Sequence, residues 1–194
     1  MTSALAIKEK ESYTYADYLK WPEGERWEII EGKPYNMSPA PATRHQRIAW
    51  ELSGQIRDFL KGKDCEGFAA PFDVRLDDTD NADAENLTVV QPDISVICDP
   101  DKIDERGCKG APDWIIEIIS PSTASRDYIL KRELYEKYGV KEYWLLHPSD
   151  RILTVFRMGE MKKYLVPEYY DAQAEVEVKT LPGLKIVLPS LFGE

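Results

Sequence analysis

One stretch of the sequence constrains the fold more than any other: the run Trp114–Ile119, which carries a single carboxylate, Glu117, among apolar residues. The run lies between Pro112 and Pro121, and five of its six residues are apolar, so we predict a strand that is buried on both faces. A lone carboxylate in a dry interior is costly unless it is paired, protonated or bound to a metal. The rest of the chain must therefore supply a partner for Glu117.

A second acid occupies a comparable position earlier in the chain. Asp93 follows Pro92 within the run Leu87–Ile97, which we predict to be another strand. If the two strands are neighbours, Asp93 and Glu117 lie roughly 5 Å apart on one face, and two acids at that distance repel unless a cation lies between them. The alternatives are a salt bridge to a core Arg or Lys, or a strand end that opens to water. For two acids in adjacent strands we favour a functional site.

Two longer helices are expected beside these strands. The segment from Thr43 to Lys61 has apolar residues at helical spacing, with Thr43 as its N-cap and Gly62 as its stop. A second helix follows residues 120–123 and runs to about Tyr138. Its expected buried side consists of Ile129, Leu130, Leu134 and Tyr138. Because residues 141–148 form the next predicted strand, this helix makes a βαβ-like crossover, and the core is α/β rather than an all-β barrel.

Shorter elements flank this core. Residues 13–21 are expected to form a short helix capped by Thr14, and residues 26–38 a hairpin around Gly32. Short strands are expected at 152–158, 160–166, 174–180 and 184–188, and the acidic segment 77–85 is expected to be a solvated turn. We expect residues 1–12 to be frayed and residues 13–194 to form one domain.

Composition limits the classes of function. The chain of 194 residues has a net charge of −10, so it lacks the basic surface that is usual for nucleic-acid binders, although a local basic cleft or a metal site remains compatible with it. The sequence lacks a bilayer-spanning run and a signal peptide's hydrophobic segment, and we expect a cytoplasmic protein with no membrane partner. Cys65, Cys98 and Cys108 form an odd set without CxxC spacing, which argues against a zinc knuckle and a disulfide framework.

Common catalytic signatures are absent from the sequence. It contains no GxGxxG, GxxxxGK[ST], HExxH or GxSxG pattern, so a nucleotide cofactor, zincin proteolysis and a serine-hydrolase elbow have no support. What remains is the order Asp93, Glu117, Lys131. This order resembles the PD-(D/E)XK nuclease signature, in which an Asp and a Glu on adjacent strands bind magnesium and a Lys acts on the attacking water. Ile119 stands where that lysine is expected, so the role would pass to Lys131 on the following helix.

Further motifs sharpen this resemblance. In chain order they are Trp27–Gly32, His45 at the head of a helix, Gln91–Asp93, Glu117–Thr123, then Lys131, Tyr135 and Gly139–Trp144. Together they resemble the Uma family of bacterial "putative restriction endonucleases", and the likeness covers about residues 12–190. His147 departs from the family, which usually carries an Asp before the proline. The resemblance implies a restriction-endonuclease-like α/β (α+β) fold with a mixed central sheet flanked by helices, an extra N-terminal hairpin and extra C-terminal strands.

The resemblance also implies a mechanism, namely hydrolysis of DNA phosphodiester bonds assisted by Mg²⁺, with Mn²⁺ as a substitute. Asp93, Glu117 and the carbonyl of Ile118 would hold the metal, and Lys131 would orient the attacking water or stabilise developing charge. Glu28 is the favoured additional acid, while Glu31 and Glu51 are weaker candidates.

Contacts to DNA are expected from basic residues near this site. The candidates are Arg44, His45, Arg47 and Arg126, and Lys131 and Arg132 would add to a positive cleft. For Arg44, His45 and Arg47, which belong to the first long predicted helix, a position on a solvated helix face is a commoner explanation than contact with nucleic acid.

An alternative keeps the fold but makes the chain a non-catalytic nucleic-acid-binding or assembly module. In that case Glu117 and Lys131 form a buried ion pair, or Lys131 forms a weak i,i+4 pair with Asp127. A homodimer is expected for either reading, because a dimer would help a small acidic protein to bracket a duplex.

Overall fold

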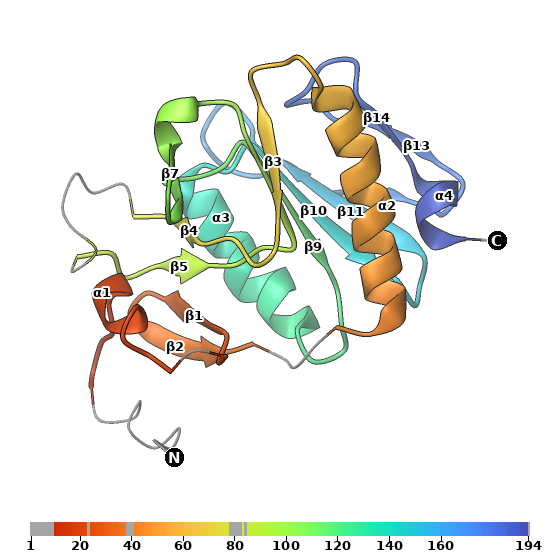
Figure 1. The fold of residues 1–194 in the computed structure, drawn as a ribbon. Coiled ribbons are helices and arrows are strands. Elements are labelled where there is room, and N and C mark those ends of the chain that lie inside the picture. Colours follow the sequence, from red (N-terminus) through yellow and green to blue (C-terminus); the bar gives the residue numbers. More distant parts are fainter. Residues whose placement is uncertain (1–9, 23, 38–40, 78–82, 84, 194) are drawn as a thin grey trace.

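The structure is a computed structural model that describes the chain apart from residues 1–9, 23, 38–40, 78–82, 84 and 194. Most of the expected frayed segment 1–12 and most of the acidic segment 77–85 therefore lie outside the described residues. The fold is mixed α+β, as expected, with two six-stranded sheets, a two-stranded hairpin and flanking helices (Figure 1).

The central sheet contains the strand that carries Glu117. Its strand order is β12 (Glu168–Tyr170), β11 (Ile152–Arg157), β10 (Glu142–His147), β9 (Trp114–Ile118), β6 (Ile94–Ile97) and β3 (Glu66–Ala69). β9 pairs with β10 in parallel and with β6 in antiparallel register. These pairings confirm two predictions: the crossover through the second helix, and the adjacency of the two strands at whose ends the acids lie.

A second sheet packs beside the first. Its order is β2 (Lys33–Asn36), β1 (Trp27–Ile30), β5 (Val89–Val90), β4 (Val74–Arg75), β8 (Gly107–Lys109) and β7 (Ile103–Asp104), and the short 3₁₀-helix η2 (Pro100–Lys102) precedes β7. The prediction of one continuous strand over residues 87–97 is wrong, because β5 and β6 belong to different sheets. Pro92 lies at the crossing, where its missing N–H would break a ladder in either sheet. This break leaves Asp93 just before β6, at the strand end.

The two faces of the central sheet bury different partners. Trp114, Ile116 and Ile118 of β9 face a core built with α2 (Thr43–Leu60), α4 (Leu188–Phe192) and the hairpin of β13 (Glu175–Glu177) and β14 (Lys185–Val187). Ile115 and Ile119 face the other core, which contains Leu134 and Tyr135 of α3 (Arg132–Tyr138). Side chains alternate along a strand, so Glu117 lies on the same face as Ile115 and Ile119, toward α3.

Helix α2 confirms the strongest helical pattern of the sequence. It buries Ile48, Leu52, Ile56 and Leu60. The expected cap is wrong, because Thr43 is already the first helical residue and Ala42 occupies the N-cap without a side-chain hydrogen bond. Gly62 follows the helix with φ 74°, a conformation that glycine adopts without a steric penalty.

The helix after β9 begins with an unusual segment. Residues Arg126–Lys131 form the π-helix η3, and α3 continues from Arg132 until Gly139 ends it at φ 84°. The expected buried side is partly wrong: Ile129 is 60% exposed, whereas Asp127 and Lys131 are buried with Leu134 and Tyr135. A hydrophobic pattern cannot anticipate this orientation, because buried Lys131 depends on acidic partners from strands β1 and β9, and Asp127 depends on Lys131.

The remaining elements mostly follow the prediction. The short helix α1 (Tyr15–Tyr18) is capped by Thr14, and β1 and β2 form the expected hairpin around Gly32. The strand expected at 160–166 is wrong, because this segment turns back through a single bridge between Met158 and Tyr164, and β12 follows it. In the described part of the chain, no helix is both long and apolar enough to cross a membrane.

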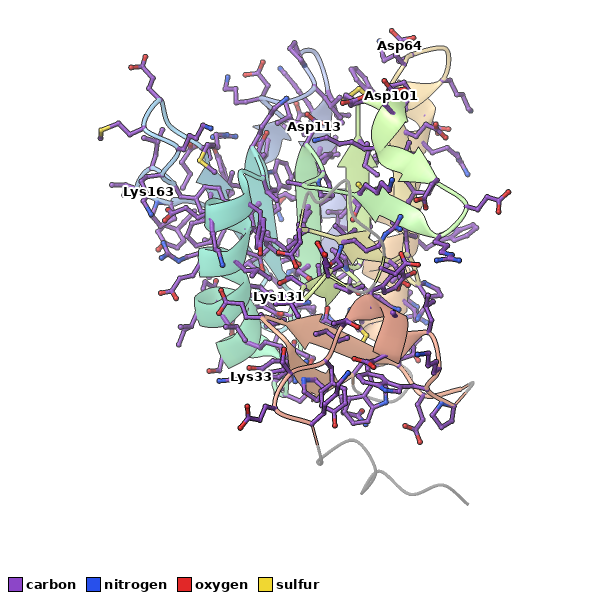
Figure 2. The ribbon with its side chains drawn as sticks, turned by 90° about the vertical axis from the view of Figure 1, so that its left-hand side faces the viewer. Lys33, Asp64, Asp101, Asp113, Lys131 and Lys163 are labelled. Atoms are coloured by element: carbon purple, nitrogen blue, oxygen red, sulfur yellow. A yellow bond between two sulfur atoms is a disulfide. The ribbon has the colours of Figure 1, made fainter. Side chains whose placement is uncertain are left out.

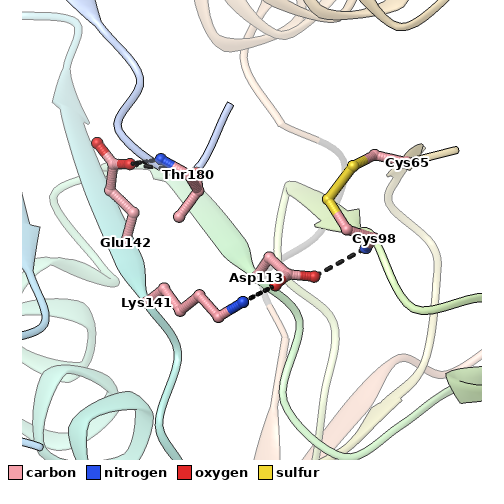
Figure 3. The surroundings of a disulfide bond; sticks show 6 residues. All are labelled: Cys65, Cys98, Asp113, Lys141, Glu142 and Thr180. Atoms are coloured by element: carbon pink, nitrogen blue, oxygen red, sulfur yellow. Dashed lines mark hydrogen bonds and ion pairs between the residues drawn. A yellow bond between two sulfur atoms is a disulfide. The ribbon is translucent and has the colours of Figure 1, made fainter. Parts of the chain in front are cut away.

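The cysteines overturn one expectation. Cys65 and Cys98 form a disulfide between the segments that flank β3 and β6 (Figure 3). The spacing of the cysteines along the sequence does not indicate this disulfide. Glu66 of β3 pairs with Ile97 of β6, so Cys65 and Cys98, one residue beyond this pair, face each other across the two strands. Asp113 accepts the Cys98 N–H at 2.7 Å and pairs with Lys141 at 2.6 Å. The prediction that the cysteines form no disulfide framework is therefore wrong for Cys65 and Cys98.

Candidate active site

A cleft of about 540 Å³ opens where β1, β6, β9, the start of α2 and η3 meet. It is lined at its acidic end by Glu28, Asp93, Glu117, Asp127 and Lys131. Two further predicted residues, Arg44 and His45, line it from the first turn of α2, and Arg126 lines it from η3. The structure thus brings most of the predicted site residues to one place.

The buried end of the cleft is organised around the ammonium group of Lys131. Lys131 Nζ lies 2.8 Å from Oε1 of Glu117 and 2.7 Å from Oε1 of Glu28. The lysine side chain is 4% exposed and lies on the inner side of its helix, toward the β1–β2 hairpin (Figure 2). The predicted pair with Asp127 is also present, but at 3.8 Å it is the longest of the three contacts.

This cluster holds more negative than positive charge. Burial, with repulsion from Asp127, Asp93 and Glu28, raises the pKa of Glu117 well above its ordinary value, even though Lys131 acts in the opposite direction. Burial alone would lower the pKa of Lys131, but the three carboxylates raise it well above its ordinary value. The lysine therefore stays charged, and one ammonium cannot fully compensate the acids that surround it.

Asp93 approaches the same place from the end of β6. Its Oδ2 accepts the Ile118 N–H at 2.7 Å and lies 3.2 Å from His45 Nε2. Burial lowers the pKa of His45, but the contact with Asp93 outweighs burial and raises it overall. The bond to the Ile118 amide fixes the Asp93 carboxylate against the strand that carries Glu117.

The donor set is compatible with a magnesium ion. Among the described residues, neither Oδ1 of Asp93 nor Oε2 of Glu117 has a hydrogen-bond partner, so each acid keeps one oxygen available. No cluster of three His, Cys, Asp or Glu side chains arranged to hold a metal occurs in the described part of the chain. Mg²⁺ commonly takes one or two carboxylates and keeps several waters, so two acids and the Ile118 carbonyl satisfy its preference.

Of the three candidates for an additional acid, Glu28 alone lines the cleft. Its side chain is 1% exposed, and Oε1 accepts the Gln91 N–H at 3.0 Å besides contacting Lys131. Glu31 is exposed and pairs with Lys137, while Glu51 lines other surfaces of α2. The geometry of Glu28 suits a role in holding Lys131 rather than a role as a third metal ligand.

The basic residues divide between different surfaces. Arg126 lies 3.6 Å from Glu28 Oε2 and stacks over the ring of Tyr35, while Arg44 is exposed at the cleft. Arg47 lines a neighbouring groove, and Arg132 does not line the cleft. Fewer basic residues than predicted therefore line the cleft, and carboxylates offset the charge of Lys131.

Several contacts at the site were not anticipated from the sequence. Asp127 was expected only as a weak i,i+4 partner of Lys131, yet it is buried beside it. Tyr135, one turn further along the helix, donates its hydroxyl to Glu117 Oε1 at 3.1 Å. The i,i+4 spacing of Asp127, Lys131 and Tyr135 was the available signal, since such residues share one face of a helix.

The site thus combines a mixed sheet, two acids at neighbouring strand ends and, in contrast to the nuclease signature that it resembles, a lysine from the following helix. The chain belongs to the family described as "Putative restriction endonuclease" (Uma2), whose model matches residues 15–189. This membership confirms the resemblance seen in the sequence.

Two relatives span nearly the whole chain. A solved structure, described as a putative nuclease belonging to DUF820 from Anabaena variabilis, superposes with a TM-score of 0.72 at 26% identity, covering 93% of this chain and 97% of that one. An uncharacterized protein of Synechocystis sp. is 27% identical over 179 residues, which is 91% of this chain and 89% of that protein.

Proposed function

We propose that the protein is a Mg²⁺-dependent endonuclease that hydrolyses DNA phosphodiester bonds. The observation that carries the proposal is the meeting of Asp93, Glu117 and Lys131 in one cleft, although they come from two strand ends and a helix. Membership in a family described as putative restriction endonucleases supports the same reading.

Each side chain has a role that follows from its contacts. Asp93 and Glu117, with the Ile118 carbonyl, would hold the metal ion. When bound, the ion would activate a water molecule and polarise the phosphoryl oxygen. Lys131 would place a positive charge where negative charge develops on the phosphate, and Glu28 would keep its ammonium group in position. The Tyr135 hydroxyl would fix the Glu117 carboxylate through its hydrogen bond.

One observation favours the alternative, a binding or assembly module that does not cleave. Lys131 already contacts three carboxylates, which is also what a purely structural buried ion cluster would show. The two readings differ in what a divalent ion does: a nuclease gains stability and activity from it, whereas a structural cluster gains neither.

The decisive experiment compares wild type with Glu117→Gln and Asp93→Asn in a DNA cleavage assay with and without Mg²⁺. Glu133→Gln is a matched control, because it removes an exposed carboxylate of α3 that lines neither the cleft nor the neighbouring groove. We expect cleavage by wild type and by the control, and loss of about a hundredfold or more in both site variants. Cleavage that persists in Glu117→Gln would belong to a contaminant, and the proposal would then be abandoned.

Metal binding is tested separately by thermal unfolding. We expect Mg²⁺ or Mn²⁺ to raise the melting temperature of wild type by mass action, and to leave that of Asp93→Asn unchanged. An equal increase in both proteins would place the ion elsewhere. The homodimer stays a prediction, which sedimentation in the presence of DNA tests directly.

A further inference from the structure

A second groove continues from the catalytic cleft along the exposed side of α2. It has a volume of about 920 Å³ and lies between the first half of α2 and the C-terminal helix α4. Arg44 lines both the cleft and this groove, so the two hollows lie next to each other at the first turn of α2. Figure 1 shows α2 and α4 side by side, and Gln55 joins them through a hydrogen bond of 2.8 Å to Ser190.

The groove gathers arginines that lack an acidic partner. Arg44, Arg47 and Arg151 line it, and none of them forms an ion pair with another described residue. By contrast, Arg57, Arg75, Arg106 and Arg157 are each paired with an acid. Glu51 is the one acid among the residues that line the groove, so the three arginines leave a local positive excess that attracts an anion, in a chain whose net charge is −10.

The same groove presents an exposed tryptophan. Trp50 is 78% exposed, whereas Trp114 and Trp144 are fully buried. Trp50 lies one helical turn after Arg47, so the indole ring and the guanidinium group share the solvent side of α2. An aromatic ring beside arginines is the composition of surfaces that bind single-stranded nucleic acid, since the ring stacks on a base while the arginines contact phosphates.

We propose that this groove binds an unpaired stretch of the DNA substrate next to the bond to be cleaved. The inference rests on the proposed function, which assigns DNA to the adjoining cleft. Bases in a duplex are stacked on one another and cannot offer a face to Trp50, so the groove selects DNA with a single-stranded segment over uninterrupted duplex. Arg44 would contact the backbone where it passes from the groove into the cleft.

The test measures binding without cleavage. Oligothymidylate is titrated into the full-length protein in EDTA, and tryptophan fluorescence is followed, because Trp50 is far more exposed than the core tryptophans. We expect quenching in wild type and weaker quenching by a duplex of equal length. Trp50→Ala should weaken oligothymidylate binding about five- to a hundredfold, as measured by anisotropy of a labelled strand, and Trp50→Phe should restore most of it.

Arginine variants supply an independent readout. Arg47→Ala should weaken binding and reduce the slope of log affinity against log salt by about 0.7, the value for one phosphate contact on a single strand. The matched control is Arg57→Ala, which removes an arginine of the same helix that is paired with Asp58. Tyr169→Ala is the aromatic control, because this ring is 67% exposed outside the groove.

The outcomes separate this inference from the proposed function. Three results would each overturn the groove assignment. They are unchanged oligothymidylate binding in Trp50→Ala and Arg47→Ala, equal losses of binding in the control variants, and competition by polyglutamate that is as strong as competition by unlabelled oligothymidylate. The nuclease proposal is decided instead by cleavage in Glu117→Gln. That variant should still bind oligothymidylate as wild type does, because Glu117 does not line the groove.

Discussion

Replacing Lys131 with Met tests the charge balance on which the site depends. Methionine keeps most of the apolar stem and removes the ammonium group that contacts Glu28 at 2.7 Å and Glu117 at 2.8 Å. Both carboxylates, and Asp127 beside them, are at least nine-tenths buried. The variant would therefore leave three buried acids without their main cation.

The expected cost follows from this burial. Removing one partner of a buried ion pair costs about 3–5 kcal/mol, because the charges that remain are desolvated and uncompensated. For a chain of this size, 1 kcal/mol corresponds to roughly 2–4 °C, so the melting temperature should fall by about 6–20 °C. Glu117→Gln should cost far less, since Lys131 keeps Glu28 and Asp127, and one carboxylate no longer has to be buried.

The loss of stability caused by Lys131→Met should depend on pH in a defined direction. Burial already raises the pKa values of Glu117 and Asp127 while Lys131 acts in the opposite direction, so removing Lys131 should raise both values further. A raised pKa favours folding below the unfolded value and opposes it as pH increases. The destabilisation by Lys131→Met should therefore be largest near pH 8 and shrink toward pH 4, as measured by urea unfolding. A variant within about 1 kcal/mol of wild type at pH 8, or a loss that does not change with pH, would refute the reasoning.

Three further predictions concern other contacts. Burial lowers the pKa of His147 below its ordinary value of 6.5. The neutral imidazole therefore contributes stability above pH 6.5, and this contribution is lost on acidification. In urea unfolding, His147→Gln should lose less stability than wild type between about pH 7 and about pH 5. Reducing the Cys65–Cys98 disulfide should lower the free energy of unfolding by about 3–4 kcal/mol, and thiol titration of the unreduced, unfolded chain should find Cys108 alone. Tyr135→Phe should cost about 1 kcal/mol in stability and lower cleavage without changing DNA affinity, because it removes one hydrogen bond from Glu117.

Local patterns in the sequence predict the elements whose partners are apolar. The spacing of Ile48, Leu52 and Ile56 fixes the buried side of α2 without knowledge of what it packs against. The run around Glu117 similarly predicts β9 as a strand buried on both faces. In these segments, hydrophobic burial contributes most of the stabilisation, and the order of apolar residues along the chain is enough to indicate it.

The prediction fails where a residue depends on a distant partner. The orientation of η3 was wrong at Ile129, because buried Lys131 is stabilised by acids from β1 and β9, and buried Asp127 is stabilised in turn by Lys131. The disulfide was missed for the same reason, since it depends on the register of β3 against β6 rather than on spacing along the chain. Pairing across the fold, and not propensity, decides both cases.

The position of Lys131 on a helix changes what the N-terminal hairpin does. In the nuclease signature that the sequence resembles, the lysine lies on the same strand as the glutamate, and the strand itself fixes the position of the lysine. In this protein Ile119 occupies that place and is buried. A lysine on a helix has a long, flexible side chain that needs a second acceptor to hold it. Glu28 on β1 supplies that acceptor, and β1 is anchored by the pairing of Ile29 with Val89 just before the chain crosses to Asp93. The hairpin, expected as an addition to the core, is therefore part of the site, and moving the lysine off the strand is what requires it.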